Sequence, residues 1–143
     1  MHCLLSTTYF GPIQWYQKLN RFDCLIDGCE PFIKQTYRNR CIIATTQGTQ
    51  TLTVPIDHSL PIDHSPLTID HSSDAPANVQ CSMFNVQYSK DFRTAINPKH
   101  PQSDPDFVPK PYYQVYQQKH GFIPNLSILD LLFNMGNEAI LYL

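Results

Sequence analysis

The densest group of basic side chains lies in the segment KQTYRNR, residues 34–40. If an extended strand began at its first residue, the side chains of Lys34, Thr36, Arg38 and Arg40 would share one face, because side chains alternate along a strand. Planar guanidinium groups offer paired donors that suit a phosphate or a carboxylate. The spacing therefore fits a site for a small anionic group. A solvated edge strand that carries charge against aggregation fits it equally well, and the residues alone leave both interpretations open.

A second group of potential ligands is the sequence IDHS, which occurs three times in residues 55–72. Metal ligands must converge on one point. On a strand His58 and His64 would share a face, whereas His71 would point the other way. Prolines between the copies exclude a helix that could realign them.

The copies are nearly identical even at positions with no chemical task, as a duplicated short tract would be. We therefore expect a low-complexity IDHS-repeat loop over residues 55–75 and no metal site. Weak, adventitious metal binding and a true metal site are the alternatives. We also expect no cofactor, because the sequence shows no glycine-rich phosphate loop, no strong metal signature and no nucleophile–base pair at a recognisable spacing.

The five cysteines are an odd number without the spacing of a disulfide framework. Cys24 and Cys29 are also farther apart than the pair of a zinc knuckle. In a reducing compartment such residues are most simply small buried hydrophobes. Zinc binding or redox chemistry is the alternative.

The whole-chain composition limits the class of protein. A chain of 143 residues with 42% hydrophobic and 15% charged residues is typical of one globular domain. The net charge of -2 gives no general attraction to nucleic acid or to an anionic membrane. We see neither a leader segment nor a window apolar enough to span a bilayer. We therefore expect a cytoplasmic protein with a small anionic partner, and the sequence does not predict its oligomeric state.

The first third of the chain is regularly patterned. LLSTTYF reads as a short buried strand, and apolar residues at helical spacing predict a helix over residues 12–22, in which Pro12 is tolerated at the first position. CLIDG predicts a second strand. β-Branched residues on both sides of Gln47 and Gly48 predict a hairpin over residues 41–54.

The rest of the chain divides into a proline-rich middle and a helical end. Residues 55–111 hold nine of the twelve prolines and none of the five glycines, and residues 97–111 read as a Pro-rich linker. We predict a short helix over residues 112–121, with Gly121 as its stop, then a helix that starts at Asn125 or Ser127 and stops at Gly136. The predicted fold is a single α+β (mixed α/β) domain over residues 1–143, in which a small sheet that includes the hairpin is flanked by the N-terminal helix and the C-terminal helices.

Four segments together resemble the WbqC-like protein family: YFGPIQWYQKL, KQTYRNRC, LTVPI and HGFIPNLSILDLLFNMGNEA. They occur in the family's order, within residues 4–56 and 112–143. The resemblance implies a bacterial protein whose genes often lie among those for cell-surface polysaccharide (O-antigen). It implies a role in that biosynthesis, with a transferase that acts on a nucleotide-linked or aminoacylated sugar as the first interpretation. A non-catalytic anion-binding or scaffold protein of the pathway and a degenerate remnant without activity are the alternatives.

Carried over position by position, the family's polar residues give a set of candidate binding residues: Tyr9, Gln14, Lys34, Gln35, Thr36, Tyr37, Arg38, Asn39, Arg40, Asn125 and Ser127. No catalytic residue can be assigned, and the candidates are Lys34, His120 and Asp130. His120 fits a general base near neutral pH, although a cation in the last turn of a helix is the commoner role. Asn125, Ser127 and Asp130 also fit ordinary helix-start chemistry.

The chain departs from the family pattern in its middle. Where members usually carry a His-Trp-Arg-Thr stretch, this sequence has Asp91, Phe92, Arg93 and Thr94, and a proline-rich segment takes the place of the family's next segment. A catalytic group contributed by the replaced segment would be absent. This keeps the inactive remnant among the alternatives.

Overall fold

The computed structural model of the chain describes residues 2–56 and 89–143. Most of the IDHS repeat and Cys81 lie outside the described residues. The low-complexity loop therefore stays a prediction. Among the described residues, no helix is long and apolar enough to cross a bilayer.

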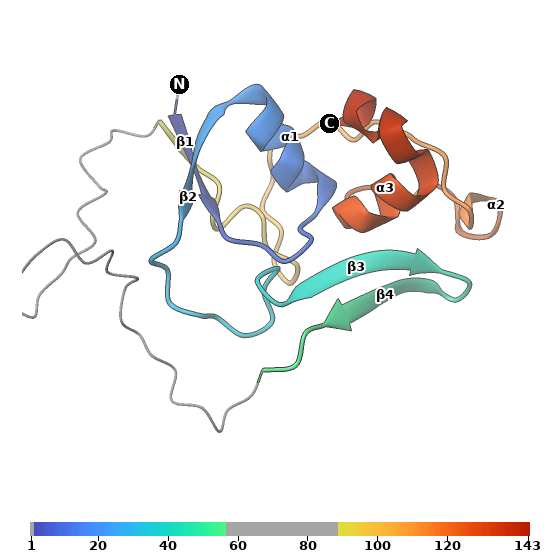
Figure 1. Cartoon of the computed structure of the whole chain (residues 1–143), viewed down its shortest axis with the longest axis horizontal. Helices are drawn as coiled ribbons and strands as arrows, with labels where there is room; N and C mark the ends of the chain where they lie inside the picture. Colours follow the sequence, from blue (N-terminus) through green and yellow to red (C-terminus); the bar gives the residue numbers. More distant parts are fainter. Residues whose placement is uncertain (1, 57–88) are drawn as a thin grey trace, which may run out of the picture.

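A small parallel sheet forms the first part of the molecule (Figure 1). Its strands stand in the order β2-β1-β5, and both outer strands run parallel to β1. The bounds are β1 His2–Ser6, β2 Asp23–Asp27 and β5 Lys90–Asp91, with helix α1 (Ile13–Arg21) between β1 and β2. The central strand β1 contains three consecutive apolar residues, Cys3, Leu4 and Leu5, and all three are buried. Such a continuous apolar run is typical of a parallel strand that is covered on both faces. Since the strands are parallel, their carboxyl ends all lie at one edge of the sheet.

Helix α1 joins two hydrophobic cores. On one side Trp15 packs with Cys3, Leu5 and Phe92 of the sheet region. On the other side Ile13 packs with residues of the C-terminal part, namely Tyr112, Ile128, Leu131 and Ala139. Figure 1 shows the helix between the sheet and α3. Its apolar residues therefore hold the two halves of the molecule together.

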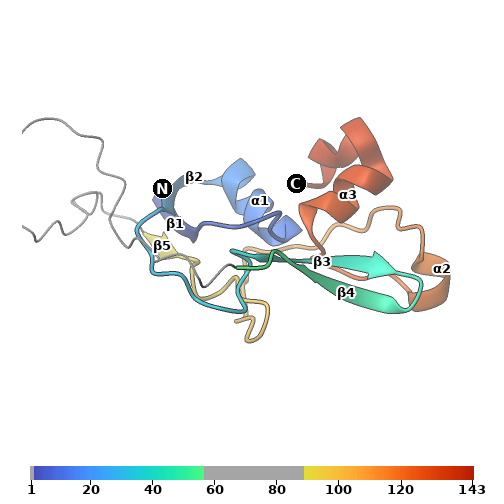
Figure 2. The same cartoon turned by 60° about the horizontal axis from the view of Figure 1, so that its bottom comes forward.

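The predicted hairpin forms a separate two-stranded sheet beside the C-terminal helices (Figure 2). Gly48 takes the positive φ of 113° that its turn requires. The outer edge of the first strand is covered, because Ser127 N donates to Ile42 O (2.8 Å) and Ala44 N donates to Asp130 Oδ1 (3.3 Å). The elements are β3 Arg40–Thr45, β4 Gly48–Thr53, α2 Gln117–His120, α3 Ile128–Met135 and the 3-10 helix η2 Gly136–Tyr142.

The mixed α/β class is confirmed, as are the N-terminal helix, the hairpin and the long C-terminal helix. Ser127 caps α3 by accepting a hydrogen bond from Leu129 N (3.2 Å), and Gly136 ends it. The prediction of a helix within residues 112–121 is wrong over its first half. There Gln114 exchanges two side-chain hydrogen bonds with the backbone of Ile123, and these tertiary contacts hold the segment out of a helix.

The prediction that the cysteines are unpaired is wrong for Cys3 and Cys24, which form a disulfide, and for Cys29, which is disulfide-bonded as well. Parallel pairing places Cys3 and Cys24 at facing positions of β1 and β2, with their Cα atoms 4.7 Å apart. Their spacing in sequence gave no sign of this register. Cys41 is free and buried, as expected.

Residues 97–111 contain neither a helix nor a strand, and they pack along α1. Gln17 Nε2 donates to Val108 O (3.2 Å), and Arg21 Nη1 donates to Asp106 O (2.9 Å). Lys18 Nζ lies 2.7 Å from Asp104 Oδ2, and both side chains are almost fully buried. Residues 97–111 are therefore held in place against α1, and we call this segment the wall.

Candidate functional site

A cavity of about 320 Å³ lies at the carboxyl ends of the three parallel strands. The segments that follow the three strands line this cavity, because parallel strands end at the same edge of the sheet. The chain pairs β2 on one side of β1 and β5 on the other, so the strand order reverses direction at β1. Such a switch point in strand order leaves a crevice where parallel sheets commonly bind ligands. The principal polar lining residues are Ser6, Thr7 and Thr8 after β1, Glu30, Thr36, Tyr37 and Arg38 after β2, and Asp91, Arg93, Thr94, Asn97 and His100 in and after β5.

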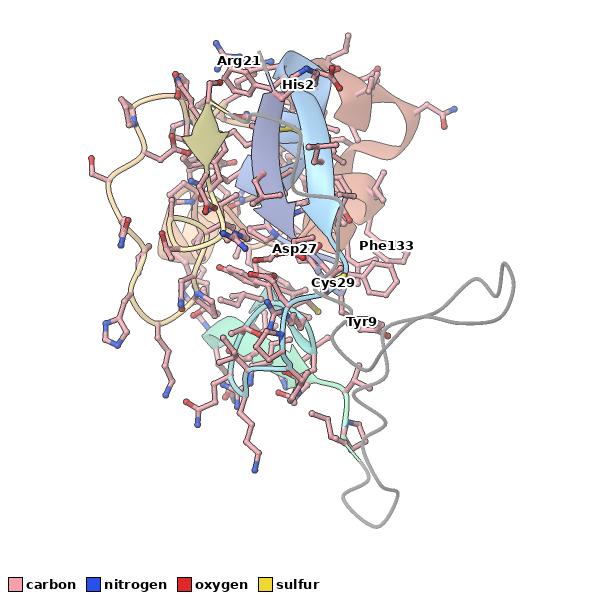
Figure 3. All side chains as sticks on the ribbon, turned by 90° about the vertical axis from the view of Figure 1, so that its left-hand side faces the viewer. His2, Tyr9, Arg21, Asp27, Cys29 and Phe133 are labelled. Carbon is pink, nitrogen blue, oxygen red and sulfur yellow. A yellow bond between two sulfur atoms is a disulfide. The ribbon has the colours of Figure 1, made fainter. Side chains whose placement is uncertain are left out.

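Arg93 ties the outer strands together across the end of β1. Its Nη1 lies 2.7 Å from Asp27 Oδ2 at the end of β2, and its Nη2 lies 2.7 Å from Asp91 Oδ2 in β5. Figure 3 shows Asp27 at the end of the sheet toward which the arrows of β1 and β2 point. The hydrogen bonds from Arg93 hold the pKa of Asp91 below its ordinary value, and the same contacts raise the pKa of the guanidinium.

Arg38 is paired as well. It forms an ion pair with Glu30 and donates to the backbone oxygen of Pro31. Glu30 Oε1 also lies 4.0 Å from Arg93 Nε, which links the two guanidinium groups through one carboxylate. Two cations and three carboxylates thus form one network at the cavity. The site is a network of ion pairs with one more carboxylate than guanidinium, and not a bare cationic pocket.

Uncharged donors complete the lining. Tyr37 is 9% exposed, and its hydroxyl makes no hydrogen bond to any described residue. Burial raises the pKa of this phenol, so the group stays protonated and can donate to a ligand. Its backbone oxygen accepts from Tyr9 N (2.7 Å), which fixes the loop to the segment after β1. Trp15 Nε1 donates to Ser6 O (2.9 Å) and forms part of the floor.

A second cavity of about 270 Å³ adjoins the first, since Tyr37 and Asn97 line both. Here Gln14 N donates to Asn125 Oδ1 (2.9 Å), and Asn125 Nδ2 donates to Gln14 Oε1 (3.0 Å). Gln14 Nε2 also donates to Asp104 Oδ2 (2.6 Å). The remaining lining residues are Ile42, Thr49, Pro98, Pro101, Ile123, Pro124 and Leu126.

The structure separates the basic cluster that the sequence indicated. Thr36, Tyr37 and Arg38 line the first cavity, but Lys34 and Arg40 do not. The alternating face proposed for an early strand is wrong, because residues 34–39 form turns and β3 begins only at Arg40. Lys34 is exposed, and Nε of Arg40 is buried without a hydrogen-bond partner among the described residues.

The other candidate binding residues from the family resemblance lie in three places. Gln14 and Asn125 line the second cavity. Tyr9 and Gln35 are exposed, and Gln35 takes a positive φ of 66° in the turn. Asn39 Nδ2 donates to Val54 O (3.2 Å), and Ser127 Oγ donates to Phe10 O (2.7 Å) besides capping α3.

The two catalytic candidates of the C-terminal part make structural contacts. Asp130 Oδ2 accepts from the hydroxyl of Tyr112 (2.8 Å), and burial together with this bond raises the pKa of that phenol. His120 Nε2 lies 3.1 Å from Thr46 O at the tip of the hairpin. Neither residue lines the first cavity.

Sequence reasoning missed Asp27, Glu30, Asp91, Arg93 and His100 as residues of this site. Two signals pointed to three of them. Asp27 lies near the end of the predicted strand CLIDG and Glu30 follows that strand closely, and Arg93 with Thr94 is what remains of the family's His-Trp-Arg-Thr stretch. Within the described ranges, no cluster of three or more histidine, cysteine or acidic residues could hold a metal ion.

The fold and the cavity define a small mixed α/β protein with a ligand-sized site at the carboxyl edge of a parallel sheet. The sequence matches the WbqC-like protein family in two parts, residues 7–91 and 84–142, so the chain belongs to that family. The two matched parts overlap at residues 84–91, a range that includes β5. No curated protein and no solved structure gives a match.

Proposed function

We propose that the protein binds a nucleotide-linked or aminoacylated sugar in the carboxyl-end cavity and acts as a transferase in bacterial cell-surface polysaccharide (O-antigen) biosynthesis. The observation that carries this proposal is the pair of arginines, Arg38 and Arg93, held beside carboxylates and hydroxyls at the switch point of the sheet. Family membership supports the biosynthetic setting.

The lining has the groups that a charged sugar needs. A guanidinium carries five N–H donors, and the described bonds of Arg38 use two of its terminal nitrogens, which leaves donors for a phosphate or carboxylate. Glu30 and Asp91 can accept hydrogen bonds from sugar hydroxyls. The cavity is at the lower end of the range of about 300–1,000 Å³ for small-molecule sites, a size suited to one sugar unit with its anionic substituent.

His100 is the group of this cavity best suited to move a proton near neutral pH. One observation favours a second function, a binding protein without catalysis. Both guanidinium groups are already paired with carboxylates, so an anionic ligand would add to an existing ion-pair network and would not neutralise a free cation. Assays for binding and for turnover separate the two functions.

Binding is tested by titration calorimetry of the purified chain with glucose 1-phosphate and with UDP-, GDP- and dTDP-glucose. Arg38→Gln is expected to weaken binding on the order of tenfold, because a hydrogen bond to a charged group contributes about 1.5–3 kcal/mol. The matched control is Lys34→Gln, at an exposed position outside the cavity. Unchanged affinity in a folded Arg38→Gln variant would contradict the proposal, as would no binding by the unaltered chain.

Catalysis is tested by incubating the chain with the same donors and a sugar acceptor, with mass spectrometry of the products. For a transferase we expect His100→Gln to lower turnover while leaving donor affinity within about twofold, since proton transfer acts in the transition state. Tight binding without any product would favour the binding protein.

A further inference from the structure

We propose that the binding site is bipartite. The charged cavity holds the sugar and its phosphate, and the adjoining second cavity holds a nucleobase. This inference rests on the proposed function and narrows its ligand to a nucleotide-linked sugar.

The first step is that the two cavities are neighbours. Tyr37 and Asn97 belong to the lining of both. The hydroxyl of Tyr37 makes no hydrogen bond to a described residue, so the residue shared by the two cavities has a donor that none of these residues engages. A ligand that reaches past Tyr37 could occupy both cavities at once.

The second step is that the two cavities differ in chemistry. The first contains two arginines, two carboxylates and a histidine. The second contains no charged side chain in its lining, and its walls are three prolines, three aliphatic residues, a threonine and the shared Tyr37. Uncharged, rigid and mostly apolar walls suit a flat ring. An aminoacyl group with a free ammonium would find no partner charge there.

The third step is that the second cavity has fixed amide groups. Gln14 and Asn125 hold one another by two hydrogen bonds although they are 111 residues apart in sequence. Gln14 is held further by Asp104, which is itself paired with Lys18. Each side-chain amide nitrogen makes one described hydrogen bond and carries a second N–H. Oriented amide donors of this kind recognise the carbonyl and ring-nitrogen edges of a nucleobase.

A substitution that fills only the second cavity tests this arrangement. Thr49 lines it from an exposed position of β4, whereas Thr51 lies two residues along the same face and lines neither cavity. A phenylalanine is well tolerated on a strand at either position. Thr49→Phe is therefore the variant, and Thr51→Phe is its matched control.

The readout is calorimetric affinity for UDP-, GDP- and dTDP-glucose compared with glucose 1-phosphate. We expect the unaltered chain to bind at least one nucleotide sugar about tenfold or more tightly than glucose 1-phosphate. Thr49→Phe should remove this advantage and leave glucose 1-phosphate binding unchanged, and Thr51→Phe should change neither.

The bipartite site is overturned if glucose 1-phosphate binds as tightly as every nucleotide sugar, or if Thr49→Phe behaves like Thr51→Phe. In both cases the binding of glucose 1-phosphate and its loss in Arg38→Gln would still support the proposed function. If the unaltered chain binds none of these compounds, both the proposed function and the bipartite site fail.

Discussion

Arg93 links more carboxylates of the candidate site than Arg38 does. It closes the ends of the outer strands over β1, and it contacts three carboxylates, those of Asp27, Asp91 and Glu30. A guanidinium suits this place because its planar donors can serve two carboxylates at once. The same residue therefore stabilises the sheet and shapes the cavity.

Replacement of Arg93 should reveal this double role. Arg93→Leu leaves Asp27, which is 7% exposed, without its charged partner, and we expect a loss of about 3 kcal/mol in the free energy of unfolding. Arg93→Lys keeps the charge but not the paired donors, and should lose less. Urea denaturation monitored by circular dichroism measures both variants. Equal stability of Arg93→Leu and the unaltered chain would contradict the assigned ion pair.

The lowered pKa of Asp91 gives a pH dependence of stability. Its folded pKa lies below the unfolded value of about 3.9, so the ionised form stabilises the folded state. This contribution is present above about pH 4 and is lost as the pH falls below the unfolded pKa through the folded one. Asp91→Asn should therefore flatten the fall in melting temperature in the acid range. If the melting temperature of the Asp91→Asn variant falls with acid as steeply as that of the unaltered chain, Asp91 does not contribute to the pH dependence of stability.

The residues of the site were only partly predictable from sequence. Arg38 and Tyr37 were identified because they belong to a dense polar cluster, but the alternation assumed for Lys34 and Arg40 failed. Turns occupy residues 34–39, and turn geometry depends on contacts such as Tyr9 N to Tyr37 O that a local pattern does not contain. His100 gave no local signal, because it lies in a segment without helix or strand.

At the scale of elements, the strongest predictions were the ones with local causes. Helix α1 follows from its apolar spacing, the hairpin from Gly48, and α3 from Ser127 and Gly136. The helix prediction over residues 112–116 is wrong because the causes there are not local. Tyr112 and Gln114 make hydrogen bonds to Asp130 and Ile123, and these contacts override helix propensity.

The start of α3 offers a test at this scale. Ser127 is 2% exposed, caps the helix and donates to Phe10 O, so Ser127→Ala removes the cap and leaves that oxygen without this donor. We expect a loss of about 1–2 kcal/mol in the free energy of unfolding. Ser127→Thr keeps the hydroxyl and should recover most of it. Thermal unfolding of the unaltered chain and the two variants measures the difference. A Ser127→Ala variant as stable as the unaltered chain would contradict the capping role.

At the scale of the whole molecule, distant parts of the chain meet at both cavities. Asp27 pairs with Arg93 across 66 residues, and Gln14 pairs with Asn125 across 111. The strand order, the register that brings Cys3 beside Cys24, and the second cavity all depend on such pairings. A single sequence shows which residues are polar or apolar, but not which distant ones face each other, so neither cavity could be predicted.

The buried Lys18–Asp104 pair holds residues 97–111 against α1 and thereby supports both cavities. Nζ of Lys18 lies 2.7 Å from Asp104 Oδ2 yet has no contact that satisfies hydrogen-bond geometry among the described residues. We treat the contact as an ion pair, because Coulomb attraction depends on distance. Nζ of Lys18 also lies 4.5 Å from the ring centroid of Phe92, within the range of a cation–π contact.

Removal of one partner should destabilise the whole molecule more than removal of both. Lys18→Met leaves a buried carboxylate uncompensated, and we expect a loss of about 3–5 kcal/mol in the free energy of unfolding. Lys18→Met with Asp104→Asn has no buried charge and keeps a side-chain oxygen that can accept from Gln14, so it should recover most of the loss. Urea denaturation gives the energies, and hydrogen exchange of residues 97–111 shows whether the wall loosens only in the single variant. If the double variant is as unstable as the single one, the packing of the lysine stem stabilises this wall and the ion pair does not.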